Sequence, residues 1–162
     1  GEAYVGLTVE HAYNIGRFVG WYYGANRGAK ARVIVGKDTR RSSYMFEAAL
    51  VSGLVASGAD AYMLHVIPTP GVAHQTVEGC FDCGIMISAS HNPFCDNGIK
   101  LVNSDGFKMD EDVLELIEDY IDGKSEVPLA TGNHIGATVD YMQGRNRYIA
   151  SLIASADRKS VV

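Results

Sequence analysis

The chain has 162 residues, of which 47% are hydrophobic and 20% are charged, and its formal net charge is -5. A domain of this size buries roughly 68–70% of its unfolded surface, so a packed core is expected without disulfide bonds. The acidic balance argues against a nucleic-acid partner, which needs a basic face. A membrane partner is also not expected, because no apolar run approaches the ~20 residues of a membrane-spanning helix.

Helical and strand patterns alternate from the N-terminus onwards. Apolar residues recur at helical spacing in the first segment, and a β-branched run after it is typical of a buried strand. A polar loop over 37–41 separates this strand from the next helical stripe. The expected elements of this half are a helix from Thr8 to about 24–28, a strand over 32–36, and a helix capped by Ser42 or Ser43 and ended by Gly58.

The same alternation continues through the second half. A threonine followed by proline suits a helix start, because proline lacks the N–H that the first turn leaves unpaired. Acidic residues crowd the start of the last helix, which suits its dipole. The expected elements are a strand over 61–67, a helix from Thr69-Pro70 to about Glu78, strands over 84–89 and 98–102, and a helix over 111–121 capped by Asp110.

This order predicts the fold class, a three-layer α/β/α domain with a mixed, mostly parallel sheet. The sheet is expected to be mixed because the link between strands 84–89 and 98–102 is short enough for an antiparallel pair. In such sheets, ligands bind beyond the carboxyl ends of the strands. The loop over 37–41 and the loop that follows strand 84–89 are therefore expected to converge on one site.

Composition changes after Ile121, which predicts a division of the chain. Gly, Ser, Thr, Asn and Pro become frequent with little periodicity, and a helical pattern returns over 140–154. One helix cannot bury its own apolar face, so the chain is expected to be a piece of a longer protein; it also begins without Met and shows no signal-peptide pattern. The predicted division is a first domain over 1–125, a linker over 126–138 and the truncated start of a second domain over 139–162.

The three cysteines do not suggest a disulfide framework, and a reducing cytoplasm is the simpler interpretation. A zinc site formed by Cys80, Cys83, His91 and Cys95 is the sharper alternative. The intervening strand rises ~3.3 Å per residue, which carries His91 too far from Cys83 for tetrahedral zinc ligation. We therefore expect no structural zinc, and we expect Cys80 and Cys83 to be small buried hydrophobic side chains.

The segment that follows strand 84–89 is the densest in chemical groups. Its serine does not fit a hydrolase elbow, because the flanking glycines of Gly-x-Ser-x-Gly are absent. Asn-Pro and Asp-Asn-Gly alone are ordinary turn residues. The run that distinguishes this turn from others is Ser88-Ala89-Ser90-His91-Asn92-Pro93, followed by Asn97-Gly98-Ile99-Lys100.

Phosphoryl transfer suits these residue types. A phosphoserine carries close to two negative charges, and its reactions depend on positioning and on electrostatic stabilisation by N–H donors and cations. Such donors are present within the turn, and arginine can approach from the loop over 37–41. The candidate donors are His91, Asn92, Asn97, Lys100 and either Arg40 or Arg41.

The same run resembles the phosphoserine signature of the phosphohexomutase family. Gly36-Lys37-Asp38-Thr39-Arg40 and Thr69-Pro70 are similar to further family motifs. The sequence from Phe94 to Lys100 is most similar to that of the bacterial phosphoglucosamine mutases. A phosphomannomutase or phosphoglucomutase of the same family, or a non-catalytic phosphate-binding fragment, stays open as an alternative.

The resemblance implies a phosphotransferase that interconverts glucosamine 6-phosphate and glucosamine 1-phosphate through a sugar 1,6-bisphosphate, which also serves as activator. It implies a hexosamine phosphate substrate, a cytoplasmic enzyme, a possible homodimer of the full-length protein, and Mg²⁺ bound through a phosphate oxygen on Ser90. The remaining metal ligands and the sugar-binding residues would lie outside this chain, so the fragment alone is expected to be inactive. The site residues implied are Ser90, His91 and Lys100 as catalytic groups and Arg40, Asn92 and Asn97 as phosphate ligands.

Overall fold

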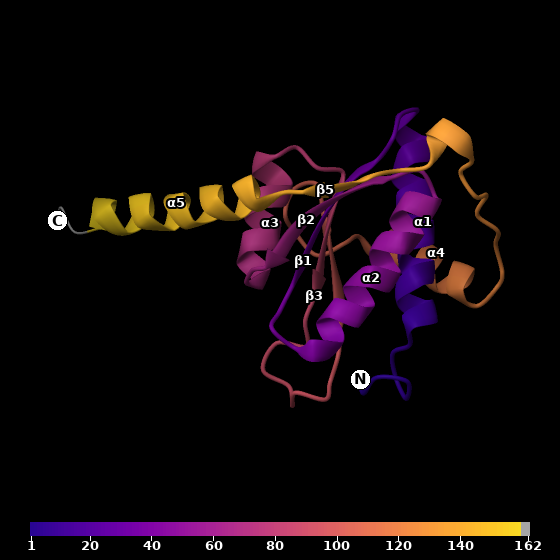
Figure 1. Ribbon diagram of the computed structural model, residues 1–162, viewed down its shortest axis with the longest axis horizontal. Coiled ribbons are helices and arrows are strands. Elements are labelled where there is room, and N and C mark those ends of the chain that lie inside the picture. The colour runs from indigo at the N-terminus through magenta and orange to yellow at the C-terminus, as the bar shows by residue number, and fades with distance from the viewer. Residues whose placement is uncertain (160–162) are drawn as a thin grey trace.

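A five-stranded sheet with helices on both faces forms the body of the protein (Figure 1). The computed structural model describes residues 1–159. The helices are α1 (Val9–Arg27), α2 (Arg41–Ala56), α3 (Thr69–Glu78), α4 (Glu111–Ile121) and α5 (Met142–Lys159), with a short 3₁₀ turn over Gly132–His134. The strands are β1 (Arg32–Lys37), β2 (Asp60–Val66), β3 (Cys83–Ile87), β4 (Ile99–Asn103) and β5 (Thr138–Asp140).

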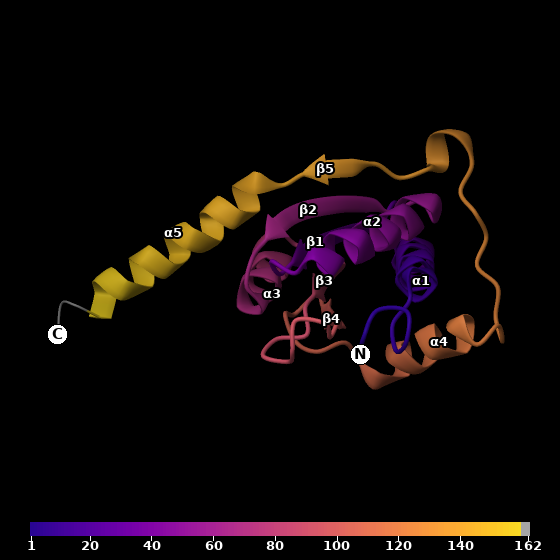
Figure 2. The same ribbon diagram turned by 60° about the horizontal axis from the view of Figure 1, so that its bottom comes forward.

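The strand order is β4-β3-β1-β2-β5, and the pairing is parallel except between β3 and β4. The expected mixed, mostly parallel α/β sheet is therefore confirmed. The helices α1, α2 and α4 lie over one face of the sheet, and α3 lies over the other (Figure 2). Helix α5 begins against α3 and then projects away from the body.

Alternation along β1 divides the core into two layers. Val33 and Val35 point into the layer beneath α1, α2 and α4, whereas Ile34 points into the layer beneath α3. All three side chains are fully buried. Both faces of the central strand are thus covered, which explains its unbroken β-branched sequence.

The first helix begins as the sequence predicts. The hydroxyl of Thr8 accepts the N–H of His11 at 3.2 Å, and the ring of His11 accepts the N–H of Thr8 at 3.3 Å. This reciprocal pair satisfies two of the N–H groups that a helix start leaves free. The helix continues to Arg27 and ends at Gly28, whose φ of 68° is left-handed.

The expected cap of α2 at Ser42 or Ser43 is wrong, because the helix begins at Arg41 with Arg40 as its N-cap. The reason lies in the loop before it. Ser43 donates its hydroxyl to the carboxylate of Asp38 at 2.6 Å, so this side chain stabilises the loop and does not cap the helix.

The segment between α4 and α5 crosses from one edge of the sheet to the other (Figure 2). The buried guanidinium of Arg17 donates hydrogen bonds to the carbonyls of Val127, at 2.6 Å, and Pro128, at 3.1 Å, which ties this segment to α1. The segment then adds β5 as a parallel edge strand beside β2. The sequence pattern missed β5 because it has only three residues and alternates between exposed and half-exposed positions.

None of the helices within residues 1–159 is both long enough and apolar enough to span a bilayer.

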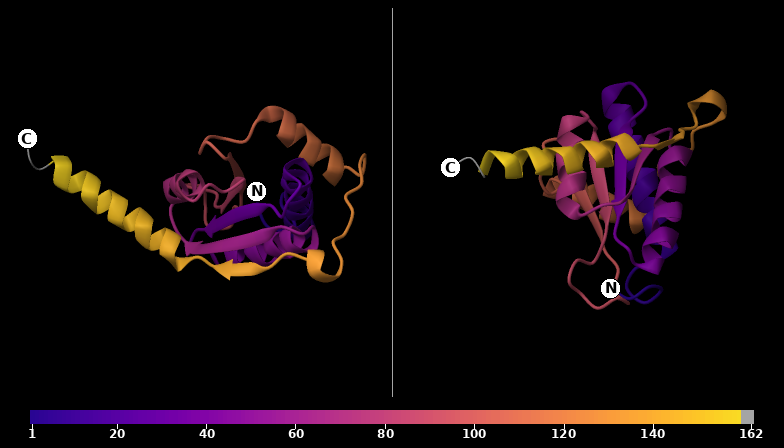
Figure 3. Two further views of the ribbon diagram at one scale, coloured as in Figure 1. Left: turned by 90° about the horizontal axis from the view of Figure 1, so that it is seen from above. Right: turned by 60° about the vertical axis from the view of Figure 1, so that its left-hand side comes forward.

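The N-terminus lies beside the loop that joins β3 to β4 (Figure 3), where the amino group of Gly1 donates to the carbonyl of Asn97 at 2.7 Å.

Candidate active site

The loops that follow β1 and β3 meet at the carboxyl ends of these two neighbouring parallel strands. The N–H of Asp38 donates to the carbonyl of Ile87 at 3.0 Å, so the two chains are still paired where the strands end. Arg40 then reaches across to the second loop and donates to the carbonyls of Ser90, at 3.1 Å, and Asn92, at 2.9 Å. The expected convergence of the two loops is therefore confirmed.

Ser90 is exposed at the centre of this site and has a left-handed backbone, with φ of 54°. Such a conformation costs a residue with a Cβ about 1–2 kcal/mol, so neighbouring contacts must maintain it. Its N–H donates to the hydroxyl of Ser88 at 3.0 Å, and its carbonyl accepts from Arg40. The hydroxyl of Ser90 is the group that this backbone presents to solvent.

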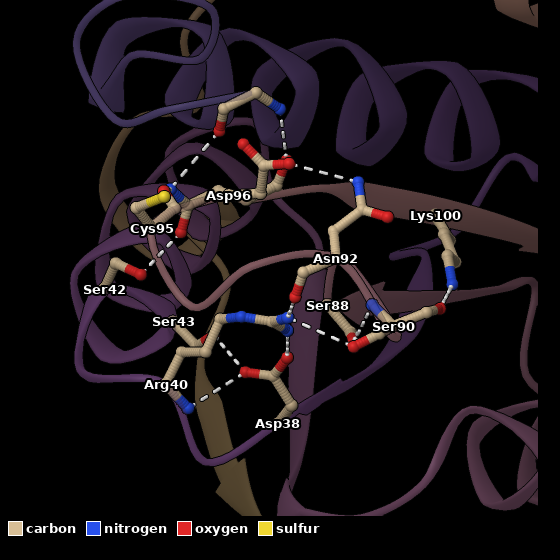
Figure 4. Close-up of polar contacts among 12 residues, drawn as sticks. Asp38, Arg40, Ser42, Ser43, Ser88, Ser90, Asn92, Cys95, Asp96 and Lys100 are labelled. Atoms are coloured by element: carbon tan, nitrogen blue, oxygen red, sulfur yellow. Dashed lines mark hydrogen bonds and ion pairs between the residues drawn. The ribbon is translucent and has the colours of Figure 1, made fainter.

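Lys100 donates a hydrogen bond from its ammonium group to the hydroxyl of Ser90 (Figure 4). The antiparallel return of the chain explains this contact, because the register that pairs Lys100 with Met86 brings the lysine back beside the loop it has just left. An ammonium at this position stabilises negative charge on the serine oxygen or on a phosphoryl group attached to it.

The loop from Ser88 to Gly98 is braced from inside by Asn97. This side chain is only 5% exposed; it accepts the hydroxyl of Ser42 at 2.5 Å and donates to the carbonyl of Cys95 at 3.0 Å. Its contacts thus stabilise the loop, and its role as a phosphate ligand stays a prediction. Gly98 permits a close approach, since a Cβ there would lie 2.8 Å from the carbonyl of Ser88.

Two other predicted residues lie on the outer side of the loop. Asn92 is exposed, and its amide donates to the carboxylate of Asp96 at 3.1 Å. His91 is exposed and has no hydrogen-bond partner among the described residues. Both side chains are therefore accessible to a ligand, and their predicted roles remain to be tested.

The charges beneath the loop are arranged in pairs. Arg40 forms an ion pair with Asp38, and Lys37 forms a buried ion pair with Glu47 at 2.8 Å. Burial alone would raise the pKa of Asp38, but hydrogen bonds from Ser43, the N–H of Arg40 and Ser88, with the charge of Arg40, lower the pKa below its ordinary value. Asp38 therefore stays ionised.

The residues around Ser90 do not form a metal site by themselves. Within residues 1–159, no group of three or more His, Cys, Asp or Glu side chains is placed to hold a metal ion. The two nearby carboxylates are already engaged, Asp38 by Arg40 and Asp96 by Asn92. A metal ion bound at this site would need most of its ligands from outside the described residues.

The cysteines are free thiols. Cys83 is buried in β3, and burial raises the pKa of its thiol. The expected burial of Cys83 is confirmed, but that of Cys80 is wrong, because Cys80 lies in the exposed turn between α3 and β3. Cys95 is exposed as well.

Asp38 and Ser88 lie in runs that the sequence analysis singled out, but the sequence assigned neither of them a role at the site. Neither residue can be assigned to the site from its local sequence alone, because the two come together only when β1 pairs directly with β3. Once that order is known, the first residue after each strand is expected at the site.

The structure is an α/β/α domain in which the hydroxyl of Ser90, hydrogen-bonded by Lys100, lies at the carboxyl ends of the parallel strands. The chain belongs to the phosphoglucomutase/phosphomannomutase family, since residues 1–128 match the family model for its α/β/α domain I. The family resemblance expected from the sequence is therefore confirmed.

Curated relatives agree with this assignment. The chain is 63% identical over 159 residues to a phosphoglucosamine mutase of Lachnoclostridium phytofermentans, covering 98% of this chain and 35% of that protein. It is 61% identical over 158 residues to a phosphoglucosamine mutase of Lachnospira eligens, with 96% and 35% covered. The corresponding enzyme of Staphylococcus aureus is 44% identical over 153 residues, with 93% and 34% covered. The chain thus spans about a third of the length of these relatives.

Solved structures show the same fold. A phosphoglucomutase/phosphomannomutase family protein from Burkholderia thailandensis superposes with a TM-score of 0.69 at 26% identity, over 87% of this chain and 31% of that one. A putative phosphomannomutase from Thermus thermophilus gives a TM-score of 0.68 at 26% identity, over 86% and 31%.

Proposed function

We propose that this chain is the phosphoserine-bearing domain of a phosphoglucosamine mutase. The observation that carries the proposal is the hydrogen bond from Lys100 to the hydroxyl of Ser90, at the carboxyl ends of the parallel strands. The three relatives above are named phosphoglucosamine mutases at 44–63% identity, which favours glucosamine phosphates over mannose or glucose phosphates as substrates.

In the proposed reaction, phosphorylated Ser90 transfers its phosphoryl group to the 1-hydroxyl of glucosamine 6-phosphate. The bond between phosphorus and Oγ of Ser90 breaks, and a bond between phosphorus and the sugar oxygen forms. Lys100 donates a proton to the departing serine oxygen, and His91 or Lys100 accepts the proton of the sugar hydroxyl. The 1,6-bisphosphate then turns, and its 6-phosphoryl group returns to Ser90 by the reverse proton transfers, which releases glucosamine 1-phosphate.

The other residues of the site serve the charge of the phosphoserine in this proposal. Asn92 and His91 are accessible on the loop as donors. Arg40 and Asn97 are the other two proposed phosphate ligands, and they also hold the loop through the carbonyls of Asn92 and Cys95. Mg²⁺ would neutralise phosphoryl charge, with ligands from outside the described residues. The free thiols suit a cytoplasmic enzyme, and a homodimer of the full-length protein and activation by the 1,6-bisphosphate belong to the same proposal.

Mass spectrometry and turnover of the full-length protein test the proposal. We expect one phosphate on Ser90, lost in Ser90→Ala and kept in Ser104→Ala, a matched change at an exposed serine in the turn after β4. Turnover of glucosamine 6-phosphate should exceed that of mannose 6-phosphate. A phosphate that persists in Ser90→Ala would falsify the role of Ser90, and a preference for mannose 6-phosphate would move the protein to the phosphomannomutases.

The 162-residue chain by itself is proposed to be inactive as a mutase. It lacks a formed metal site among its described residues and spans about a third of its relatives. Measurable interconversion of the two glucosamine phosphates by the purified chain would contradict this part of the proposal.

A further inference from the structure

The N–H and the carbonyl of Ser90 are each hydrogen-bonded by a side chain near the carboxylate of Asp38. Ser88 accepts the N–H of Ser90 at 3.0 Å, and Arg40 donates to its carbonyl at 3.1 Å. Arg40 forms an ion pair with Asp38, and Ser88 is among the groups that lower the pKa of the same carboxylate. Figure 4 shows Asp38 beneath the loop, with Arg40 reaching from it toward Ser90.

The hydrogen-bonding capacity of Ser88 explains why it can serve this role. A hydroxyl has one proton to donate and lone pairs to accept with. Because the N–H of Ser90 occupies an acceptor site, the proton of Ser88 is free for Asp38. Ser88 is only 6% exposed, so water does not compete strongly for these contacts.

Asp38 is itself held rigidly. Its side chain is 20% exposed, its Oδ1 accepts the N–H of Arg40 at 3.0 Å and the hydroxyl of Ser43 at 2.6 Å, and its own N–H is paired with the carbonyl of Ile87. The carboxylate therefore has a fixed position relative to the end of β3, where the Ser90 loop begins.

We infer that Asp38 is a positioning residue for the serine nucleophile. Its carboxylate orients Ser88 and Arg40, and these two side chains fix the N–H and the carbonyl of Ser90 in the left-handed backbone that directs the hydroxyl to Lys100. Asp38 does not hydrogen-bond the hydroxyl of Ser90, whose partner is Lys100. The inference rests on the proposed function for its kinetic consequence, but its structural consequence is independent of it.

The alternative is that Asp38 only stabilises the turn before α2, through Ser43 and the N–H of Arg40. Ser43 separates these two roles, because it donates to the same carboxylate and touches no atom of Ser90. Ser43→Ala is therefore the matched control for Asp38→Asn. Ser88→Ala removes one of the two contacts to Ser90, and Ser88→Thr keeps the hydroxyl.

The kinetic arm uses the full-length protein and glucosamine 6-phosphate. In Asp38→Asn, the amide protons of the asparagine face the N–H donors of Arg40, so Arg40 no longer holds the Ser90 loop in place. A misplacement of about 1 Å at a reacting group costs ~10²-fold in rate. We expect kcat to fall by about that factor with KM changed by less than ~3-fold. Ser88→Ala should lower kcat in the same direction, and Ser88→Thr should restore it. Ser43→Ala leaves Asp38 with the N–H and the guanidinium of Arg40, so it should lose far less than Asp38→Asn.

The structural arm uses crystal structures of the same full-length variants. We expect Ser90 to leave the left-handed region, or its hydroxyl to lose Lys100, in Asp38→Asn and in Ser88→Ala but not in Ser43→Ala. If wild type is inactive on sugar phosphates, the proposed function fails and this arm still decides the inference. An unchanged Ser90 backbone in Asp38→Asn, or a Ser43→Ala variant as impaired as Asp38→Asn, would overturn it.

Discussion

The ammonium group of Lys100 donates a hydrogen bond to the hydroxyl of Ser90, although a polar loop separates the two residues in the sequence. The antiparallel pairing of β3 with β4 produces this contact, since a parallel return would have carried Lys100 to the opposite end of the sheet. The antiparallel pair at this edge of the sheet therefore has a direct consequence for the site.

Lys100→Gln should abolish most phosphoryl transfer while leaving the fold intact. The amide keeps hydrogen-bonding capacity but has neither the charge nor the transferable proton, and a positioned acid or base contributes typically 10²–10⁴-fold. We expect kcat of the full-length protein to fall by at least ~10²-fold. The measurement is the rate of phosphate exchange between Ser90 and sugar bisphosphate.

Lys108→Gln provides the control for that experiment. Lys108 is also an exposed lysine near β4, but it pairs with Glu111 at 2.5 Å and not with Ser90. Its substitution should leave the exchange rate unchanged. Equal losses in the two variants would show that general positive charge matters, and not the contact with Ser90.

The ionisation of Asp38 predicts a specific dependence of stability on pH. Its folded-state pKa is lower than its ordinary value of 3.8, so its contribution is fully present above pH 3.8 and is lost as pH falls through the lower folded pKa. The difference in unfolding free energy between wild type and Asp38→Asn should therefore be constant from about pH 5 to 7 and shrink below about pH 3.8. Urea denaturation of both proteins across this range measures it; a difference that grows on acidification would contradict the prediction.

The sheet was predictable because each central strand carries its own signal. The β-branched run of β1 and the apolar run of β3 are buried on both sides, so they are recognisable without knowledge of their neighbours. Strand β5 carries no such signal, because Thr138 and Asp140 are exposed and the strand exists only by pairing with β2. Edge strands of this kind are specified by tertiary contacts and not by local sequence.

The site was predictable to the extent that it lies in one segment. Ser90 and Lys100 belong to a single continuous motif, so their relationship could be inferred from its spacing. The role of Asp38 depends on β1 lying beside β3 in a register that pairs Lys37 with Ile87, and one sequence does not contain that order. The approach of Arg40 or Arg41 to this loop was predicted, but the particular partners of Arg40, the carbonyls of Ser90 and Asn92, were not.

The buried ion pair below the site predicts a large loss of stability when one partner is removed. The ammonium of Lys37 lies 2.8 and 2.9 Å from the two carboxylate oxygens of Glu47 and 4.4 Å from the ring centre of Tyr44. Glu47→Gln leaves this ammonium buried without its counter-charge, which should lower the free energy of unfolding by about 3–5 kcal/mol. Urea denaturation of the chain measures the change.

A double substitution tests whether charge pairing or packing is responsible. Lys37→Met combined with Glu47→Leu removes both charges at similar volume, so most of the lost stability should return. If the double variant is less stable than Glu47→Gln, the two side chains contribute mainly through shape.

The contact between α1 and α2 depends on two glycines that face each other across the helix pair. A Cβ on Gly16 would lie 2.1 Å from the carbonyl of Leu50, and a Cβ on Gly53 would lie 2.1 Å from the carbonyl of Tyr13. Both obstacles are backbone atoms, which cannot rotate away, so Gly53→Ala must push the helices apart. We expect a loss of at least about 1–3 kcal/mol in the free energy of unfolding, measured by urea denaturation.

Gly24→Ala is the matched change in α1, because its Cβ would meet the carbonyl of Ala29 at 3.4 Å, an ordinary contact distance. The higher helix propensity of alanine should there leave stability unchanged or raise it by up to ~1 kcal/mol. Equal effects of Gly53→Ala and Gly24→Ala would mean that the close approach of the two helices does not limit stability. A loss confined to Gly53→Ala is expected, since only that methyl group meets backbone of the partner helix at a distance no side-chain rotation can relieve.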